Sequence, residues 1–375
     1  MTAIYNVYYH PLSAFPGPKV AAATRWPYVV QLLNGSKVRW TTALHSAYGE
    51  VVRVAPDELS FINPSAWQDI FVRRPQLPRD AKFNPDFSLT TAKPLVATNN
   101  EDHARYRRIL GHAFSDKALR EQEYILMRYI DLLVSRLKEQ IKSGDASTIF
   151  DICEWYNYTT FDLIGDLCFG QAFHSLQNME HHPWVANIFK GLKFVTLISA
   201  LCYFPPANSV AKWCAPRFVK DKIRQSLEFT VKRIDWRMQQ KTERPDIMAY
   251  IMQNNSSQGM TRDEIDANMA LLVLAGSETS STALSATTWY LLKNPETMDK
   301  LRREIQGAFR TDADIKLSSV SVLPYLHAVL TEALRMHPPA PLTVPRVVTS
   351  GGVQICGMFV PEGVSPPFRT FIISD

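Results

Sequence analysis

The chain has few cysteines, and their spacing argues against a domain held together by disulfides or by zinc. Five cysteines occur among 375 residues, and no two of them form a C-x-x-C pair. We therefore expect neither a disulfide framework nor a zinc site. The usage favours a reducing compartment.

A dense run of Lys or Arg is also missing. The formal net charge is only +5, which is typical of a mildly cationic surface rather than of a nucleic-acid-binding patch. We therefore expect no nucleic-acid partner. An anionic lipid surface or an acidic redox protein fits the small basic excess better.

The N-terminus lacks the features of a signal peptide. Residues 1–15 have no charged lead-in and only a short apolar run, so we expect neither a secretory signal nor a membrane anchor in this chain. The segment that follows is instead rich in Pro and Gly. It reads Tyr9-His10-Pro11-Leu12 and Phe15-Pro16-Gly17-Pro18-Lys19.

The remaining sequence predicts a mainly α fold with a small β-sheet, an α+β class. Residues 20–48 have the pattern of amphipathic helix, and residues 50–61 alternate like a hairpin. Helical signals then dominate from 101 to 317. Pro324 and Pro338 bracket one short helix. Two short strands are predicted after it, at 343–348 and 351–360.

The longest apolar segment, Met269–Leu292, contains a single charge, Glu278. As a helix it would extend about 36 Å, enough to cross a bilayer. A charge at mid-depth is costly in a membrane, and the acids at 263–266 are typical of the first turn of a soluble helix. A buried central helix is therefore favoured over a membrane span.

Within this helix lies the motif Ala275-Gly276-Ser277-Glu278-Thr279-Ser280. The Thr279 hydroxyl can bond to the carbonyl of Ala275 and open the helix locally. The small residues Ala275 and Gly276 would then leave room for a diatomic ligand. The alternative is that they serve close helix packing, with Glu278 in a structural ion pair.

A second motif, Glu332-Ala333-Leu334-Arg335, ends the helix before His337-Pro338-Pro339. Glu332 and Arg335 stand at i, i+3, so alone they could be an ordinary surface pair. In this order, however, the two motifs resemble those of the haem-thiolate monooxygenases, the cytochrome P-450 superfamily. The resemblance is to fungal members of secondary metabolism and covers nearly the whole chain.

The resemblance implies a cytochrome P-450 fold and roles for both motifs. Glu278 and Thr279 match the acid–alcohol pair that relays protons to haem-bound oxygen, beside a groove formed by Ala275 and Gly276. Glu332 and Arg335 match a buried pair that bonds to an arginine further along the chain. Without that later segment, a buried pair would be only partly satisfied and costly.

The same resemblance implies haem b as cofactor and three residues that hold its propionates. His103 and Arg107 lie at i, i+4 of a predicted helix, on one face, and match two of them. Arg346 matches a third. The alternative for His103 and Arg107 is a solvated basic face.

The cysteine that should ligate the iron is missing. The family loop reads F-x-x-G-x-R-x-C-x-G, and we expect it beyond Asp375, so this chain itself presents no metal ligand. Phe161 and Cys168 fit part of the pattern, but Ile164 and Asp166 occupy the glycine and arginine places. An acidic neighbour also disfavours a thiolate.

Further expectations about partners rest on the resemblance alone. They are electrons from an NADPH-cytochrome reductase, a small lipophilic substrate and peripheral membrane contact, with the chain in the cytoplasm or on the cytosolic face of the endoplasmic reticulum. The apolar run 194–204 could be a membrane-dipping or access segment, or core. The residues proposed for the substrate pocket are Phe83, Phe87 and Leu95.

The chain thus divides into a Pro/Gly hinge remnant at 1–19, an incomplete P-450 catalytic domain at 20–364 and a divergent tail at 365–375. A change of reading frame near Ser365 would explain the tail. The function implied is oxidation of a small lipophilic metabolite, with this chain inactive for want of the cysteine loop. Two alternatives remain: an active enzyme whose sequence continues, or a haem-free binding or scaffold protein.

Overall fold

The computed structural model describes residues 1–80, 92–143, 149–185, 196–197, 200–201, 203–204, 217–240, 244–255, 259–341 and 345–366. Two compact units make up the chain. Unit 1 contains Met1–Phe87, Phe189–Asp221 and Ala340–Ile373, whereas unit 2 contains Ser88–Ile188, Lys222–Pro339 and Ser374–Asp375. Each unit is therefore assembled from segments far apart in the sequence.

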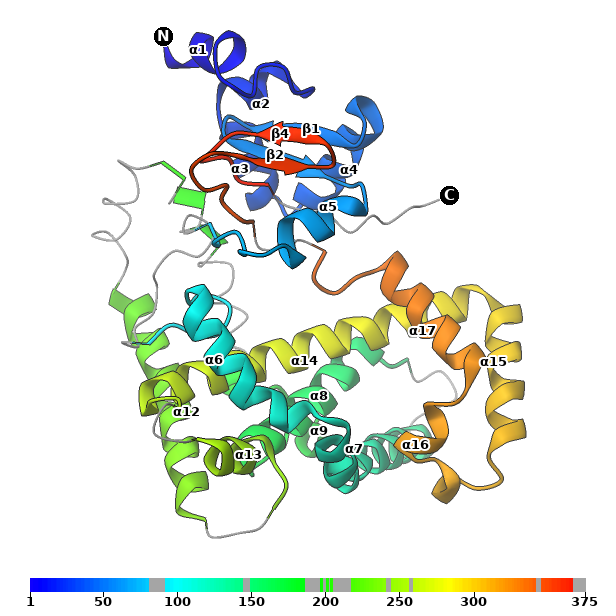
Figure 1. The fold of residues 1–375 in the computed structure, drawn as a ribbon. Coiled ribbons are helices and arrows are strands. Elements are labelled where there is room, and N and C mark those ends of the chain that lie inside the picture. The colour runs from blue at the N-terminus through cyan, green and yellow to red at the C-terminus, as the bar shows by residue number, and fades with distance from the viewer. Residues whose placement is uncertain are drawn as a thin grey trace. The chain divides into compact units, whose positions relative to one another are not determined.

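Unit 1 combines short helices with two antiparallel hairpins (Figure 1). In β1 and β2, Val51 pairs with Phe61 and Val52 with Ser60. In β3 and β4, Val353 pairs with Val360 and Ile355 with Met358. Its described elements are α1 (Thr2–Tyr8), α2 (Lys19–Ala23), α3 (Trp26–Leu33), α4 (Lys37–Tyr48), β1 (Val51–Ala55), β2 (Glu58–Phe61), α5 (Ser65–Trp67), the π-helical turn Gln68–Val72, β3 (Val353–Ile355) and β4 (Met358–Val360).

The core of unit 1 joins the two ends of the described chain. A buried apolar cluster brings residues from 12 to 70 against residues from 348 to 364. A backbone bridge between Glu58 and Ser365 adds to this junction. The members of the cluster are Leu12, Val51, Leu59, Phe61, Ala66, Ile70, Val348, Ile355, Val360 and Val364.

The Pro/Gly segment packs directly on β1. The Arg53 backbone N–H donates to the carbonyl of Pro16 at 2.7 Å. A Cβ on Gly17 would lie 2.5 Å from the Arg53 carbonyl oxygen, so only glycine fits this close approach. The buried Arg53 guanidinium also donates to the carbonyl of Asn6 at 2.9 Å. The N-terminal residues are thereby fixed to the first strand.

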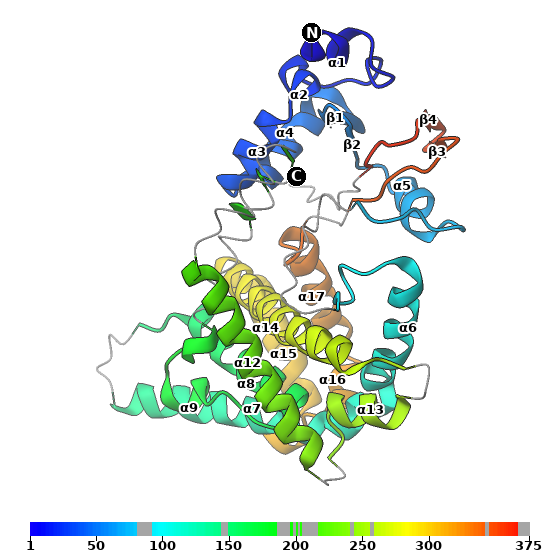
Figure 2. The same ribbon diagram turned by 90° about the vertical axis from the view of Figure 1, so that its left-hand side faces the viewer.

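Unit 2 is helical throughout its described part. Its helix α14 lies beside α8, and α15 and α17 pack near the far end of α14 (Figures 1 and 2). The elements are α6 (Asn100–Gly111), the 3-10 turn His112–Phe114, α7 (Asp116–Ser143), α8 (Ile152–Phe169), α9 (Ser175–Asn178), most of α12 (Arg217–Gln239), α13 (Ile247–Asn254), α14 (Arg262–Lys293), α15 (Pro295–Ala308), the 3-10 turn Asp312–Asp314, α16 (Leu317–Val320) and α17 (Pro324–Met336).

The start of α14 has the acidic first turn that the sequence predicts. Thr261 caps the helix by accepting from the Glu264 N–H, and the Glu264 side chain accepts from the Thr261 N–H in return. This capping box satisfies two N–H groups that the first turn leaves open. In the part of the chain that is described, no helix combines the length and hydropathy of a membrane span.

The fold confirms several predictions and corrects two. The fold class, the hairpin within 50–61 and the helix that begins at Pro324 are confirmed. The strand predicted at 343–348 is wrong for 345–348, where only an isolated bridge at Arg346 occurs. The buried central helix is correct only for the first half of α14. Beyond it, the side chains of Leu284, Trp289 and Leu292 are exposed.

Candidate functional site

The hydrogen bond predicted within α14 is present. The Thr279 hydroxyl donates to the Ala275 carbonyl at 2.6 Å, and both residues are exposed. The helix nevertheless remains α-helical from Arg262 to Lys293, so the bond does not open the backbone here. The hydroxyl and the small residue share one accessible face.

Gly276 does not share that face. A Cβ at this position would lie 2.9 Å from Cδ1 of Ile164 on α8. Gly276 therefore serves close contact between α14 and α8, as the packing alternative proposed. Of the two small residues expected beside a diatomic ligand, only Ala275 lies with Thr279 on the exposed side.

Glu278 is half-buried, and no described ion pair includes it. Its Oε2 atom is buried and accepts no hydrogen bond from the residues that the structure describes. Burial raises the pKa of this carboxyl, while the charge of His181 acts in the opposite sense. A carboxyl with a raised pKa keeps its proton to a higher pH than a free glutamate does, which suits a group that holds and passes on a proton.

A groove of about 530 Å³ adjoins Glu278. It lies between α8 and α14 and is lined by polar side chains, among them Asn157, Ser281 and Ser285. The Ser281 hydroxyl donates to Asn157 Oδ1 at 2.8 Å. Ser281 and Ser285 follow Glu278 along one stripe of α14, and Asn157 faces them from α8, so the groove beside the acid is polar.

His103 and Arg107 lie on α6 of unit 2, at the predicted i, i+4 spacing. His103 is half-buried and Arg107 is exposed. Between them, Arg105 turns to the start of α14 and donates to both carboxylate oxygens of Glu264, at 2.7 and 2.8 Å. That ion pair fixes the helix and leaves the guanidinium of Arg107 on the surface.

Arg346 belongs to unit 1. Its Nη1 donates to the Leu77 carbonyl at 3.1 Å, and the guanidinium lies over the Phe71 ring, 5.4 Å from the centroid. Its Nε is buried and makes no hydrogen bond to the described residues. Burial lowers the pKa of Arg346, and the neighbouring Arg79 lowers it further. A carboxylate would relieve both effects.

Sequence reasoning did not single out Arg79. An antiparallel bridge places it against Arg346, and burial lowers its pKa as well. Two poorly solvated guanidiniums side by side favour an anionic ligand. The Leu77-Pro78-Arg79 segment carries no motif that could have revealed this, because the bridge joins residues remote in sequence.

The expectation that Glu332 and Arg335 form a buried pair is wrong for this chain. The two side chains make a bidentate ion pair, with both N–O distances 2.7 Å. However, their exposed fractions are 59% and 41%. Since water solvates both ions, the pair bears no desolvation penalty.

Two of the three described cysteines do not favour an iron-binding thiolate. Cys168 is fully buried, and burial followed by the charge of Asp246 raises the pKa of its thiol. Burial and Asp69 raise the pKa of Cys356. Cys153 is exposed on α8, and Cys202 and Cys214 lie outside the described residues. Nor do the described His, Cys, Asp and Glu side chains form a group that could hold a metal ion.

The proposed substrate-pocket residues are only partly visible. Phe83 and Phe87 lie outside the described residues. Leu95 is half-buried, and its backbone N–H donates to Asn268 Oδ1 on α14 at 2.7 Å. This bond connects the segment that precedes α6 to α14, the helix that carries Glu278 and Thr279. A role for Leu95 in substrate binding remains a prediction.

Comparison with known proteins defines the family. The model of the family Cytochrome P450 matches residues 21–365. The chain is 40% identical to cytochrome P450 monooxygenase astJ of Aspergillus oryzae, covering 96% of this chain and 73% of that protein. It is 41% identical to averantin hydroxylase of Dothistroma septosporum, covering 97% and 68%, and 40% identical to cytochrome P450 monooxygenase lcsI of Purpureocillium lilacinum, covering 97% and 71%. The chain belongs to the cytochrome P450 family.

The cofactor of this family is haem, and the described residues fit it in part. Arg346, with a buried unpaired N–H and a lowered pKa, suits a propionate. Thr279 and Ala275 offer the exposed face on which an oxygen ligand could lie. Cys168 and Cys356 do not suit the thiolate that would hold the iron, because the pKa of each thiol is raised.

Proposed function

We propose that this chain has the architecture of a monooxygenase for small lipophilic metabolites but does not itself carry out oxygen insertion. The observation that carries the proposal is a contrast. The hydrogen bond from Thr279 to Ala275 is retained, whereas the described cysteines have thiols that are buried or beside acids, with only Cys153 exposed. The family identity supports the substrate class.

Different residues of the chain would transfer protons and bind the haem propionates. When bound through a thiolate, haem supplies the redox chemistry that activates oxygen. Glu278 would hold and release a proton, and Thr279 would offer a hydroxyl beside it. Arg346 would pair with a propionate, and the family resemblance alone proposes the same role for His103 and Arg107. No residue described here would hold the iron.

We also propose contact with a membrane surface and with an NADPH-cytochrome reductase. Exposed aromatic and apolar side chains near the N-terminus support the membrane contact, since Tyr and Trp favour the interface between water and lipid. Their exposed fractions lie between 51% and 74%. The residues are Ile4, Tyr5, Tyr8, Tyr9 and Trp26.

The test is the carbon monoxide difference spectrum of the reduced chain, expressed with haem supply. Full-length astJ of Aspergillus oryzae, prepared in parallel, is the positive control. We expect either no haem uptake or a Soret band without thiolate character. A thiolate-type band would overturn the proposal, and serine variants of each of the five cysteines would then identify the ligand.

A haem-free binding role is the second candidate. The groove beside Glu278, about 530 Å³ in volume, has the size of a small-molecule site. Equilibrium dialysis of the haem-free chain against a panel of lipophilic metabolites would decide it. Saturable binding that Ser281→Trp abolishes would favour this function, and its absence across the panel would exclude it for those compounds.

A further inference from the structure

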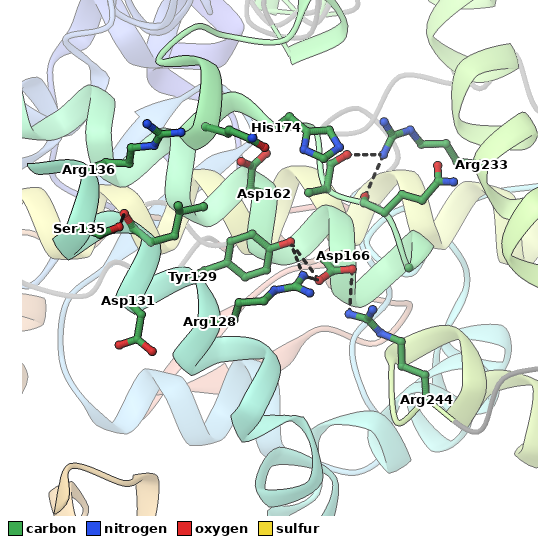
Figure 3. Close-up of a pocket in the computed structure, with 15 residues that line it drawn as sticks. Arg128, Tyr129, Asp131, Ser135, Arg136, Asp162, Asp166, His174, Arg233 and Arg244 are labelled. Carbon is green, nitrogen blue, oxygen red and sulfur yellow. Dashed lines mark hydrogen bonds and ion pairs between the residues drawn. The ribbon is translucent and has the colours of Figure 1, made fainter. Parts of the chain in front are cut away.

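A second cavity lies within unit 2 (Figure 3). Its volume is about 970 Å³. It is bounded by α7, the end of α8 with the segment that follows, α12 and the residues before α13. None of the residues predicted to hold haem or to relay protons lines it. Its chemistry is therefore separate from the proposed oxygenase function.

Four arginines contribute to the lining. Arg128 and Arg136 come from α7, Arg233 comes from α12, and Arg244 stands just before α13. Figure 3 shows Arg136 on one side of the cavity and Arg233 and Arg244 on the other. Four guanidiniums from three parts of the chain thus face one space, against the three carboxylates of Asp131, Asp162 and Asp166.

The two buried carboxylates of the lining, Asp162 and Asp166, already have hydrogen-bond or ion-pair partners within the protein. Asp162 accepts from the backbone N–H groups of Ser175 and Leu176, at 3.0 and 2.9 Å. Asp166 accepts from Tyr129 at 3.0 Å and forms ion pairs with Arg128 and Arg244. Their oxygens are directed at partners within the protein, so they do not saturate the remaining guanidiniums.

The arginines have hydrogen-bonding capacity to spare. Arg233 donates through Nη1 to the carbonyls of Gln171 and Ala172, at 2.9 and 3.2 Å. Arg136 Nη1 donates to the exposed Glu139 at 3.0 Å. Since a guanidinium carries five N–H donors, both have donors beyond these contacts.

Arg233 is also held in place. Its guanidinium lies over the rings of Phe173 and Phe229, 4.6 and 4.8 Å from their centroids. A planar guanidinium fixed on aromatic faces loses little freedom when it binds a second group. Burial lowers the pKa of Arg233, and the charge of Asp162 acts in the opposite sense. A bound anion would add to the effect of Asp162 and favour the charged guanidinium further.

We propose that this cavity binds a small phosphate-bearing molecule, with Arg136 and Arg233 gripping the phosphate from opposite walls. Guanidiniums recognise phosphate through paired N–H···O bonds. The volume exceeds that of a single phosphate and lies in the range of sites for small organic ligands. The exposed Gln177 and Ser135, which also line the cavity, offer amide and hydroxyl groups to the rest of the ligand.

Calorimetric titration of the full chain with pyrophosphate, at physiological salt, tests the proposal. Arg136→Gln removes one of the two guanidiniums proposed to bind phosphate. It leaves the buried ion pairs intact, because the described partner of Arg136, Glu139, is exposed. Arg302→Gln is the control, because Arg302 also forms an ion pair with an exposed acid three residues away, Asp299, outside the cavity. We expect Arg136→Gln to raise the Kd at least tenfold and Arg302→Gln to leave it unchanged.

A second variant guards against indirect effects. Gln177→Glu places a carboxylate at the exposed edge of the cavity and should weaken pyrophosphate binding to a similar extent, with the circular dichroism spectrum unchanged. Absence of binding by the unmodified chain would overturn the proposal. So would a Kd that Arg136→Gln and Arg302→Gln change equally, which would indicate attraction to the surface in general.

Discussion

Two bidentate ion pairs in unit 2 have the same chemistry and opposite surroundings. Arg237 and Asp246 meet through N–O distances of 2.7 and 3.0 Å, with exposed fractions of 3% and 0%. Glu332 and Arg335 meet at 2.7 Å twice but are exposed to 59% and 41%. In this chain the pair within the family motif is the solvated one, and the pair without a motif is buried.

The comparison teaches that a recognisable motif and a contribution to stability are separate properties. Asp246 also caps α13 by accepting from the Ala249 N–H at 2.9 Å, so its removal affects more than one partner. Glu332 and Arg335 are three residues apart on one helix, a spacing that folds into contact without any tertiary structure. Stability should therefore respond to the first pair far more than to the second.

The largest effect is expected for Arg237→Met. It leaves the Asp246 carboxylate buried without its main partner, which typically costs about 3–5 kcal/mol. Urea denaturation followed by circular dichroism measures the loss. Adding Asp246→Leu should restore part of it, although the lost cap costs about 1 kcal/mol. A loss below about 1 kcal/mol for Arg237→Met would contradict the assigned role of burial.

An intermediate effect is expected for Glu264→Gln. Hydrogen bonds from Arg105 are the main reason that the pKa of Glu264 falls to about 2. A depressed folded pKa adds stability that is complete above about 4.5, the ordinary value, and that is lost as the pH falls toward 2. We expect the variant to lose about 1–2 kcal/mol at pH 7 and almost nothing at pH 2. Equal losses at both pH values would refute the electrostatic cause.

A smaller effect of opposite sign is expected for Glu278→Gln. Burial raises the pKa of Glu278 above the ordinary glutamate value of 4.5. Ionisation of this carboxyl therefore costs stability once the pH rises above 4.5. The amide avoids that cost, and we expect a small gain in stability at pH 8 with no change at pH 4. Thermal melts at the two pH values measure it. A loss at pH 8 would reveal a stabilising partner for the carboxylate.

The smallest effect is expected for Glu332→Gln. Water replaces the contacts that Arg335 provides, so the midpoint of urea denaturation should not move measurably. Arg335→Gln should behave in the same way. A clear loss in either variant would mean that the pair is covered in solution, and the contrast with Arg237 and Asp246 would fail.

Local patterns in the sequence predicted the elements well. The acidic first turn of α14 and the hydrogen bond from Thr279 to Ala275 depend on residues within one or two turns. The same is true of the hairpin that pairs Val51 with Phe61. Such features depend on residues close in sequence, so local sequence patterns are enough to predict them.

Contacts between distant residues could not be predicted. The residues around Gly276 do not predict that it contacts Ile164 on α8. No sequence spacing predicts the bridge between Arg79 and Arg346. The exposure of Glu332 likewise depends on what surrounds α17 in three dimensions. The family resemblance supplied roles for residues, but their burial depended on the folded chain.

The split core of unit 1 has a consequence for biosynthesis. Leu12 and Ile70 emerge from the ribosome early, whereas their partners Val348 and Val364 are among the last described residues. At translation rates of 5–20 residues per second, the early half waits about 15–60 seconds for the late half. During this interval its apolar side chains are accessible to chaperones, and slower synthesis of the intervening helices would prolong that exposure.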